Sequence, residues 1–243
     1  MDKNFRDKAY ASYVSSFKTS QESIDDLKMK KLHEEYKYRL LPLVETLAKS
    51  SPILELGCGP GYLLKYLMKQ GFNDVTGIDI SKEQLEIAHK MGLKVIHGDA
   101  LEFLSEENSC YKAIIAIDFV EHFDKNEIFD LFHRISSALI KDGILIIQTP
   151  NGQGLFPGQV IYGDLTHLTI LGEDSLRHLL QYHGFGNIQF YETSPIPNDI
   201  EGKFRFVAWQ IIRAIIRLCR QIEAKNTSKI WTENMICASK KIK

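Results

Sequence analysis

Short apolar runs alternate with amphipathic helical segments from about residue 52 onward, and no other feature of the sequence constrains the fold as strongly. The runs are rich in Ile, Val and Leu, and they lie at residues 53–56, 75–80, 93–97, 112–118 and 143–148. Helical periodicity separates most of them, at residues 62–70, 83–91 and 125–140. Runs of this kind are typical of parallel strands that are buried on both faces. The pattern therefore predicts an α/β fold, in which helices cover both faces of a mainly parallel sheet.

Size and composition agree with one globular unit that carries added elements. The chain has 243 residues, of which 44% are hydrophobic and 25% are charged. A domain of this size buries most of its unfolded surface, so it needs no disulfide or metal for stability. The four cysteines show no CxxC spacing, which argues against a zinc ribbon and favours a reducing, cytoplasmic compartment. The net charge of −1 gives no indication of a nucleic-acid partner.

The sequence divides into four parts. They are an N-terminal helical part at residues 1–50, a core at 51–193, a helical insertion at 194–230 and a last strand at 231–243. We expect the N-terminal helices to act as a lid, because a closing lid excludes water from a site and completes it. The lid would carry four tyrosines, Tyr10, Tyr13, Tyr36 and Tyr38.

A glycine-rich turn joins the first strand to the first helix of the core. It reads Gly57-Cys58-Gly59-Pro60-Gly61 and follows Glu55 after one residue. Glycines in such a turn let the backbone approach a ligand closely, and the helix that follows offers amide groups at its N-terminus. The GxGxG spacing is one residue tighter than the GxGxxG dinucleotide fingerprint, and no Gly-Lys-Ser/Thr follows as in a P-loop. A tight turn without a ligand is the alternative interpretation.

Acidic residues stand at the ends of the next three strands. Asp79 ends the second strand, Asp99 follows the third and Asp118 ends the fourth. The carboxyl ends of parallel strands share one edge of an open sheet, and ligands bind at that edge. There, Asp79 can accept hydrogen bonds from the hydroxyls of a ribose, and Asp99 can accept one from an amine such as adenine N6. Asp99 can alternatively serve as a helix N-cap, and Asp118 as an N-cap or as a salt-bridge partner.

The segments ILELGCGPG, GIDIS, HGDAL and AIIAIDFVEHF follow one another in the sequence. In the order and spacing of these segments, the chain resembles the class I S-adenosylmethionine (SAM)-dependent methyltransferases over about residues 36–192. The resemblance implies a Rossmann-like sheet of seven strands, mainly parallel, with an antiparallel strand at the C-terminus. It also implies SAM as the cofactor and S-adenosylhomocysteine as its product.

The resemblance further implies which residues form the cofactor site. Glu55 and the loop glycines would surround the methionine moiety of SAM. Asp79 would hold the ribose, Asp99 the adenine amine, and Asp118 would lie beside the sulfonium. The full expected set is Glu55, Gly57, Cys58, Gly59, Gly61, Asp79, Ile80, Asp99, Ala100 and Asp118.

Two histidines are candidates for a general base. Methyl transfer from SAM is an in-line displacement in which the protein mainly aligns donor and acceptor, and a hydroxyl acceptor also benefits from a base. His122 follows the fourth strand, and His167 lies in the segment DLTHL. We expect His167 to be the base and His122 to be the second choice. The alternatives are a packing role for His122 and a loop-anchoring hydrogen bond for His167.

We expect no metal site. Asp118, with Asp164 or Asn151, could supply oxygen ligands to Mg²⁺, but nothing in their spacing requires it.

Residues 203–223 form a basic amphipathic helix on a helical wheel. One face gathers apolar side chains, and five basic residues with no acidic residue lie between positions 203 and 220. One interpretation is a cap or a dimer-interface helix whose apolar face meets protein. A second is peripheral contact with an anionic membrane surface. A third is contact between the arginines and an anionic acceptor.

Together these features predict a SAM-dependent methyltransferase that acts on an oxygen acceptor, by preference a sugar or glycan hydroxyl. The segments TPNG (residues 149–152) and DLTHL (residues 164–168) are similar to those of methyltransferases in bacterial glycan and ubiquinone biosynthesis. A phenolic, quinol or lipid-like acceptor is the alternative within this class. A non-catalytic SAM-binding subunit is the alternative from another class. A nicotinamide-dependent dehydrogenase is a third class, which the tight glycine loop disfavours.

Overall fold

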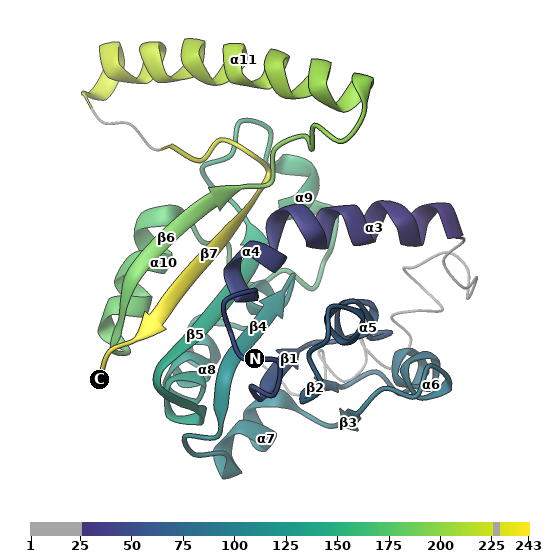
Figure 1. The fold of residues 1–243 in the computed structure, drawn as a ribbon. Helices are drawn as coiled ribbons and strands as arrows, with labels where there is room; N and C mark the ends of the chain where they lie inside the picture. Colours follow the sequence, from purple (N-terminus) through teal and green to yellow (C-terminus); the bar gives the residue numbers. More distant parts are fainter. Residues whose placement is uncertain (1–25, 226–228) are drawn as a thin grey trace.

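The alternating segments form the expected sheet. The computed structural model describes residues 26–225 and 229–243, and its seven strands form one sheet in the order β3-β2-β1-β4-β5-β7-β6 (Figure 1). The strands are β1 (Ile53–Leu56), β2 (Val75–Asp79), β3 (Val95–His97), β4 (Tyr111–Ile117), β5 (Leu139–Pro150), β6 (Phe185–Glu192) and β7 (Asn234–Lys241). Strands β1 to β5 pair in parallel, whereas β7 is antiparallel to both β5 and β6. The predicted Rossmann-like sheet with an antiparallel C-terminal strand is confirmed.

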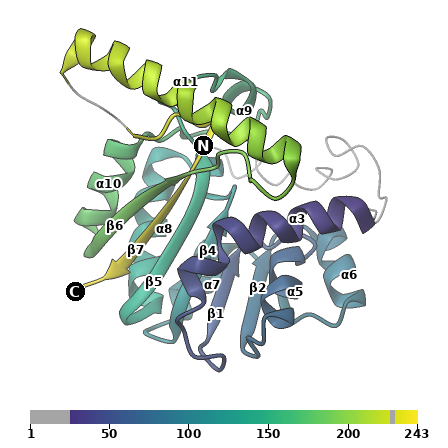
Figure 2. The same ribbon diagram turned by 45° about the horizontal axis from the view of Figure 1, so that its top comes forward.

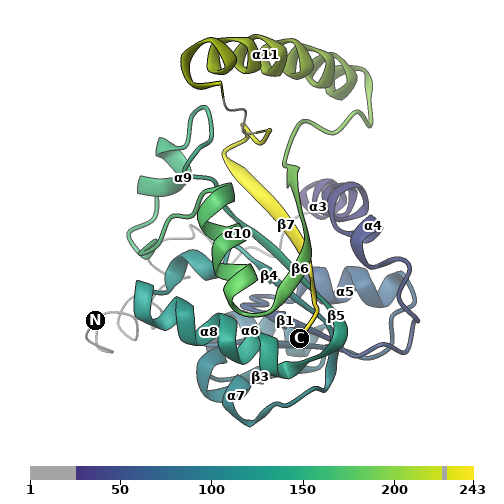
Figure 3. The same cartoon turned by 90° about the vertical axis from the view of Figure 1, so that its left-hand side faces the viewer.

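Helices lie on both faces of this sheet (Figures 1 and 3). The helices of the described residues are α3 (Asp26–Arg39), α4 (Leu41–Val44), α5 (Tyr62–Lys69), α6 (Lys82–Lys90), α7 (Ala100–Glu106), η1 (Val120–His122), α8 (Lys125–Ala138), α9 (Gly158–Tyr162), α10 (Glu173–Tyr182) and α11 (Ile200–Ala224), of which α11 lies apart from both faces (Figure 1). Strand β1 shows why both faces are covered. Ile53 belongs to the apolar cluster that includes residues of α5 and α6, whereas Leu54 and Leu56 belong to the cluster that includes residues of α7, α8 and α10.

Two short helices and one strand extension depart from the periodicity of the sequence. Helices α7 and α9 have 7 and 5 residues, which is too short for a helical period to be recognised. Helix α7 begins instead at a local cap, where the Asp99 side chain accepts hydrogen bonds from the N–H groups of Leu101 and Glu102. Strand β5 starts at Leu139, earlier than predicted, because Leu139 already pairs with Tyr111 before the regular register of β4 and β5 begins.

The glycine-rich turn packs directly on β2. The N–H groups of Gly57 and Cys58 donate to the carbonyl of Ile78 over 2.9 and 3.0 Å. A Cβ at Gly77 would come within 2.6 Å of the Cys58 sulfur and 2.7 Å of Leu64 Cδ1. Glycine inside a strand often marks such a close approach, and here it lets the turn and α5 rest on the sheet.

Of the expected lid, the structure describes residues 26–50, whereas Tyr10 and Tyr13 lie outside the described residues. Helix α3 packs over α5, where the rings of Tyr36 and Tyr66 are 5.6 Å apart. Tyr38 is exposed. The action of this part as a lid stays a prediction.

Helix α11 lies beyond the sheet, apart from its two faces (Figures 1 and 2), and none of its residues is buried. The alternative in which its apolar face caps the core is wrong, because most of its large apolar side chains are exposed. The helix is held through Trp209 and Arg213, which both reach the Glu192 carboxylate at the end of β6. These two contacts turn the opposite, apolar face away from the core. No helix among the described residues is long and apolar enough to cross a membrane.

We expect Gly77→Ala to lower the free energy of unfolding by about 1–3 kcal/mol, because the added methyl group would displace the glycine-rich turn from β2. Gly158→Ala is the matched control, since a Cβ there meets nothing within 4 Å, and its effect should stay within about 0.5 kcal/mol. Urea unfolding of wild type and both variants measures their free energies of unfolding. Equal stability of the two variants would show that the turn does not need this close approach.

Candidate active site

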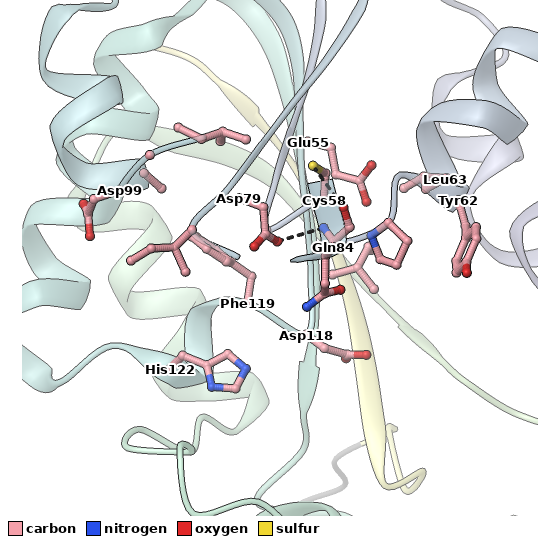
Figure 4. A pocket seen from close by; sticks show the side chains of 18 of the residues that line it. Glu55, Cys58, Tyr62, Leu63, Asp79, Gln84, Asp99, Asp118, Phe119 and His122 are labelled. Atoms are coloured by element: carbon pink, nitrogen blue, oxygen red, sulfur yellow. Dashed lines mark hydrogen bonds between the residues drawn. The ribbon is translucent and has the colours of Figure 1, made fainter. Parts of the chain in front are cut away.

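A cavity of about 380 Å³ lies at the carboxyl edge of β1, β2 and β4 (Figure 4). Every residue that the sequence places at the cofactor lines this cavity except Gly61, and both candidate histidines, His122 and His167, line it as well. Gly61 instead begins α5 with φ of 77°, and a Cβ there would come within 2.5 Å of Leu93. Its role is therefore in the packing of the turn. The sheet edge brings the remaining expected residues together, although they come from distant parts of the sequence.

Asp79 holds the glycine-rich turn in place. Its Oδ2 accepts a hydrogen bond from the N–H of Gly59 over 2.8 Å (Figure 4), and its Oδ1 accepts one from the N–H of Ser81 over 2.7 Å. Gly59 has φ of 50°, in the left-handed region that favours glycine. A carboxylate offers about four lone-pair positions, so Asp79 keeps acceptor capacity for the hydroxyls of a bound ribose.

Glu55 brings a buried carboxyl group to the floor of the cavity. Burial, and next the charge of Asp79, raise the pKa of Glu55 well above its usual value. Its Oε2 atom is buried and has no hydrogen-bond partner among the described residues. Because an unpaired buried polar atom is costly, this oxygen fits a ligand group that donates hydrogen bonds, such as the ammonium of an amino-acid moiety. The residues present therefore fit the methionine end of SAM.

The other two strand-end acids have different local roles. Asp99 caps α7 through one oxygen, with Leu101 N–H at 2.7 Å, and it also lines the cavity. The predicted alternative of an N-cap is thus present at Asp99, beside its position at the cofactor site. Asp118 is not at an N-cap. It has φ of 49°, and its carboxylate accepts a hydrogen bond from Gln148 over 3.1 Å.

The imidazole rings of His122 and His167 meet edge to face, with centroids 5.0 Å apart. Nδ1 of His122 lies 2.9 Å from the hydroxyl and 3.2 Å from the carbonyl of Thr166. The Thr166 hydroxyl donates its single proton to Asp164 over 2.6 Å, so it can only accept from His122. Nδ1 of His122 therefore carries the proton in the neutral ring. Burial, and next the proximity of His167, lower the pKa of His122 to about 4, so the ring is neutral at neutral pH.

Glu121 lies behind this pair and is fully buried. Its Oε2 accepts a hydrogen bond from the Thr149 hydroxyl over 3.0 Å. Burial, and next the charge of Asp118, raise the pKa of Glu121 to about 8. Among the described residues, neither Oε1 of Glu121 nor Nδ1 of His167 has a hydrogen-bond partner, although both atoms are buried. The acidic side chain of Glu121 was not among the residues expected at the site.

Glu121, His122 and His167 could together hold a metal ion, since their ligand atoms lie within 4.8 Å of one another. Imidazole and carboxylate ligands suit Zn²⁺ or Fe²⁺, provided that Glu121 is ionised. The magnesium ligands considered from the sequence are engaged elsewhere. Asn151 donates to backbone carbonyls before β7, and Asp164 accepts from Thr166.

The lining residues that the sequence did not place at the cofactor include Tyr36, which was expected in the lid, and Gln84 and Phe119. Tyr36 comes from α3, and burial raises the pKa of its hydroxyl. Gln84 and Phe119 approach the glycine-rich turn, where Cβ atoms at Gly59 and Gly57 would meet them at 2.6 and 2.5 Å. No local motif marks these residues, because only the packing of α3, α6 and η1 around the turn brings them to the cavity.

Comparison with known proteins decides the family. Residues 29–189, more than half of the chain, match the family described as a methyltransferase domain. The chain belongs to the class I SAM-dependent methyltransferases. The ubiquinone biosynthesis O-methyltransferase of Rickettsia prowazekii is 35% identical to this methyltransferase over 103 residues. That match spans 41% of this chain and 40% of the relative, so it covers less than half of either protein.

Solved structures of this family share the fold of the methyltransferase. The crystal structure of a SAM-dependent methyltransferase from Archaeoglobus fulgidus has a TM-score of 0.67 and 20% identity, and the match covers 94% of this chain and 98% of that one. Phosphoethanolamine N-methyltransferase 2 of Haemonchus contortus, in complex with SAM, has a TM-score of 0.64 and 16% identity, and the match covers 96% of this chain and 60% of that one. At these identities the likeness concerns the fold, and family membership establishes SAM as the cofactor.

We expect Asp79→Asn to weaken SAM binding to the methyltransferase by about 1–3 kcal/mol, because an amide nitrogen cannot accept the backbone hydrogen bond that orders the turn. Calorimetric titration with SAM and S-adenosylhomocysteine measures the loss of binding affinity. Asp74→Asn is the matched control, since this exposed carboxylate before β2 lies 3.8 Å from Lys94. If both variants bound SAM as the wild type does, the turn and the ribose would have to be held by other groups.

We expect Glu121→Gln to flatten the pH dependence of stability. The folded protein holds a proton on Glu121 up to about pH 8, whereas the unfolded chain releases it near 4.5. The contribution of Glu121 to the stability of the folded protein is therefore complete below the pKa of the unfolded chain. It is lost as the pH rises through the folded pKa of about 8. When the pH rises from about 5 to about 8, the free energy of unfolding of wild type should fall by on the order of 3 kcal/mol more than that of Glu121→Gln.

Urea unfolding of wild type and Glu121→Gln at both pH values measures this difference. The variant keeps an acceptor oxygen for Thr149, and Glu86→Gln, at an exposed position on α6, is the control. Parallel pH profiles of wild type and Glu121→Gln would mean that Glu121 is ionised in the folded protein.

Proposed function

We propose that this methyltransferase transfers the methyl group of SAM to a hydroxyl oxygen of a sugar, a glycan or another small molecule, with His167 as the general base. The proposal is carried by one observation. The edge-to-face pair of His122 and His167 lines the same cavity as the cofactor residues Asp79 and Asp118. This shared cavity supports a proton acceptor near the expected position of the sulfonium.

Bound SAM supplies a methyl group that its sulfonium has already activated. The protein would contribute alignment, through the turn held by Asp79, and a proton acceptor for the hydroxyl from the same cavity. The hydroxyl oxygen of the acceptor forms a bond to the methyl carbon as the carbon–sulfur bond breaks. The bonding electrons leave with sulfur, and the hydroxyl proton passes to His167.

The surroundings of the two imidazoles favour His167 over His122 for this role. A pKa of about 4 makes His122 a weak base at neutral pH, and its Nδ1 is already used on Thr166. His167 also lines the cavity, and its buried Nδ1 has no hydrogen-bond partner among the described residues. We therefore assign His122 as a positioning residue that packs against the base.

Two acceptor classes remain candidates. The TPNG and DLTHL segments resemble enzymes of both glycan and ubiquinone biosynthesis, and our first candidate is a sugar or glycan hydroxyl. The similarity to ubiquinone biosynthesis O-methyltransferases supports a phenolic or quinol hydroxyl as the second candidate. Formation of S-adenosylhomocysteine with panels of nucleotide sugars and of catechols distinguishes the two classes.

We expect His167→Ala to lower turnover with a productive acceptor by about 10²–10⁴ while SAM affinity stays unchanged, because the variant loses only the proton acceptor. His122→Ala should lower turnover less. His89→Ala, at an exposed position on α6, is the control and should keep full activity. Rates of S-adenosylhomocysteine formation and calorimetric titration with SAM measure the two effects.

Two outcomes would contradict the assignment of the base. Full turnover of His167→Ala would mean that the reaction needs no base at this position. Loss of wild-type activity in a chelator, with recovery on adding Zn²⁺ or Fe²⁺, would make Glu121, His122 and His167 metal ligands instead. A protein that binds SAM but forms no S-adenosylhomocysteine with any acceptor of either panel would support the non-catalytic alternative.

A further inference from the structure

Helix α11 presents a row of exposed apolar side chains along its whole length. We name this row the outward stripe, and its members are Ile200, Phe204, Val207, Ile211, Ile212, Ile215, Leu218 and Ile222, with exposed fractions from 41% to 88%. At 100° per residue they fall within an arc of about 140°. The helix has 25 residues and is therefore about 37 Å long. So long an exposed apolar surface marks an interaction site, because soluble surfaces rarely gather apolar side chains in this way.

The direction of the outward stripe is set by contacts on the opposite side of the helix. The Trp209 indole donates to the Glu192 carboxylate over 3.1 Å, and the Arg213 guanidinium pairs with the same group over 2.9 Å. Phe206 and Ile216, on the same side as Trp209, are half-buried. These contacts join α11 to the end of β6, and the stripe lies on the opposite, exposed side of the helix.

Basic side chains border the outward stripe on both sides. On the helical wheel, Lys203 and Arg217 lie along one border, whereas Arg205 lies along the other together with Glu223, and Glu201 lies near that second border. All three basic side chains are exposed, and within the described part of the chain none of them forms an ion pair. The helix therefore combines an apolar stripe with unpaired positive charge at its margins.

We propose that α11 lies in the plane of an anionic phospholipid bilayer, with the outward stripe in the acyl boundary and the basic margins on the headgroups. An in-plane helix of this kind combines a large apolar face with Lys and Arg at its borders, as α11 does. Charge selects the bilayer over a second copy of the chain. Two stripes packed antiparallel against each other would bring the Lys203 and Arg217 borders of both copies together, whereas anionic headgroups supply the opposite charge.

Exposed apolar side chains beside α11 extend this surface. Phe156, Tyr162 and Leu165 surround the short helix α9, and their exposed fractions are 71%, 84% and 74%. Helix α9 lies at the same end of the molecule as α11 (Figures 2 and 3). The segment that carries these side chains leads into His167. Docking through this end would therefore turn the loop before the proposed base toward the bilayer, whichever acceptor is methylated.

The experiment is flotation of the full chain with lipid vesicles. Vesicles of phosphatidylcholine with about 30 mol% phosphatidylglycerol should bind at least tenfold more protein than pure phosphatidylcholine, and added salt should reduce this excess. The double variant Ile211→Gln/Ile215→Gln should lower binding about tenfold or more. Lys203→Gln/Arg217→Gln should remove most of the preference for the anionic vesicles. Met68→Gln, at an exposed apolar position on α5, is the matched control and should bind as wild type does.

SAM binding by each variant confirms that it has folded, because all the substituted positions are exposed and lie outside the cavity. Two results would overturn the proposal. One is the absence of binding to the anionic vesicles. The other is a stable dimer in sedimentation analysis that Ile211→Gln/Ile215→Gln dissociates, since the outward stripe would then meet a second copy of the chain.

Discussion

The carboxylate of Asp79 is the group on which the geometry of the site depends. It accepts backbone hydrogen bonds from Gly59 in the glycine-rich turn and from Ser81 at the start of α6, so one side chain joins two connections of the fold. The absence of a side chain at Gly77 lets the same turn rest on β2. The position of the turn then decides where a cofactor lies relative to the carboxyl ends of β1 and β4.

Burial of acidic groups gives the cavity its chemical character. Desolvation raises the pKa values of Glu55 and Glu121, and the nearby charges of Asp79 and Asp118 raise them further. His122 stays neutral for the corresponding reason, because burial penalises its charged form. Such a cavity favours a ligand with positive charge, which compensates acidic groups that water no longer solvates. The ammonium and sulfonium of SAM meet this requirement, in agreement with the family to which the chain belongs.

Much of the fold was predictable because its signals are local. Apolar runs located the strands, and the strand-end acids located the binding edge, since parallel strands end on the same side of a sheet. The short helices α7 and α9 left no periodic signal, and the early start of β5 depends on pairing with Tyr111. At the site, Glu121 was missed because it looks like any acidic residue at the start of a helix until its burial is known.

The sequence by itself determined the order of strands and helices, the cofactor loop and the amphipathic character of α11. Tertiary structure alone decided that His122 and His167 form a pair behind which Glu121 is buried, and that Gly61 packs against Leu93 instead of lining the cavity. It also decided which way the apolar face of α11 points. Periodicity shows which residues share a face of one element, but the direction of that face depends on contacts with distant elements, here those made by the Glu192 carboxylate at the end of β6.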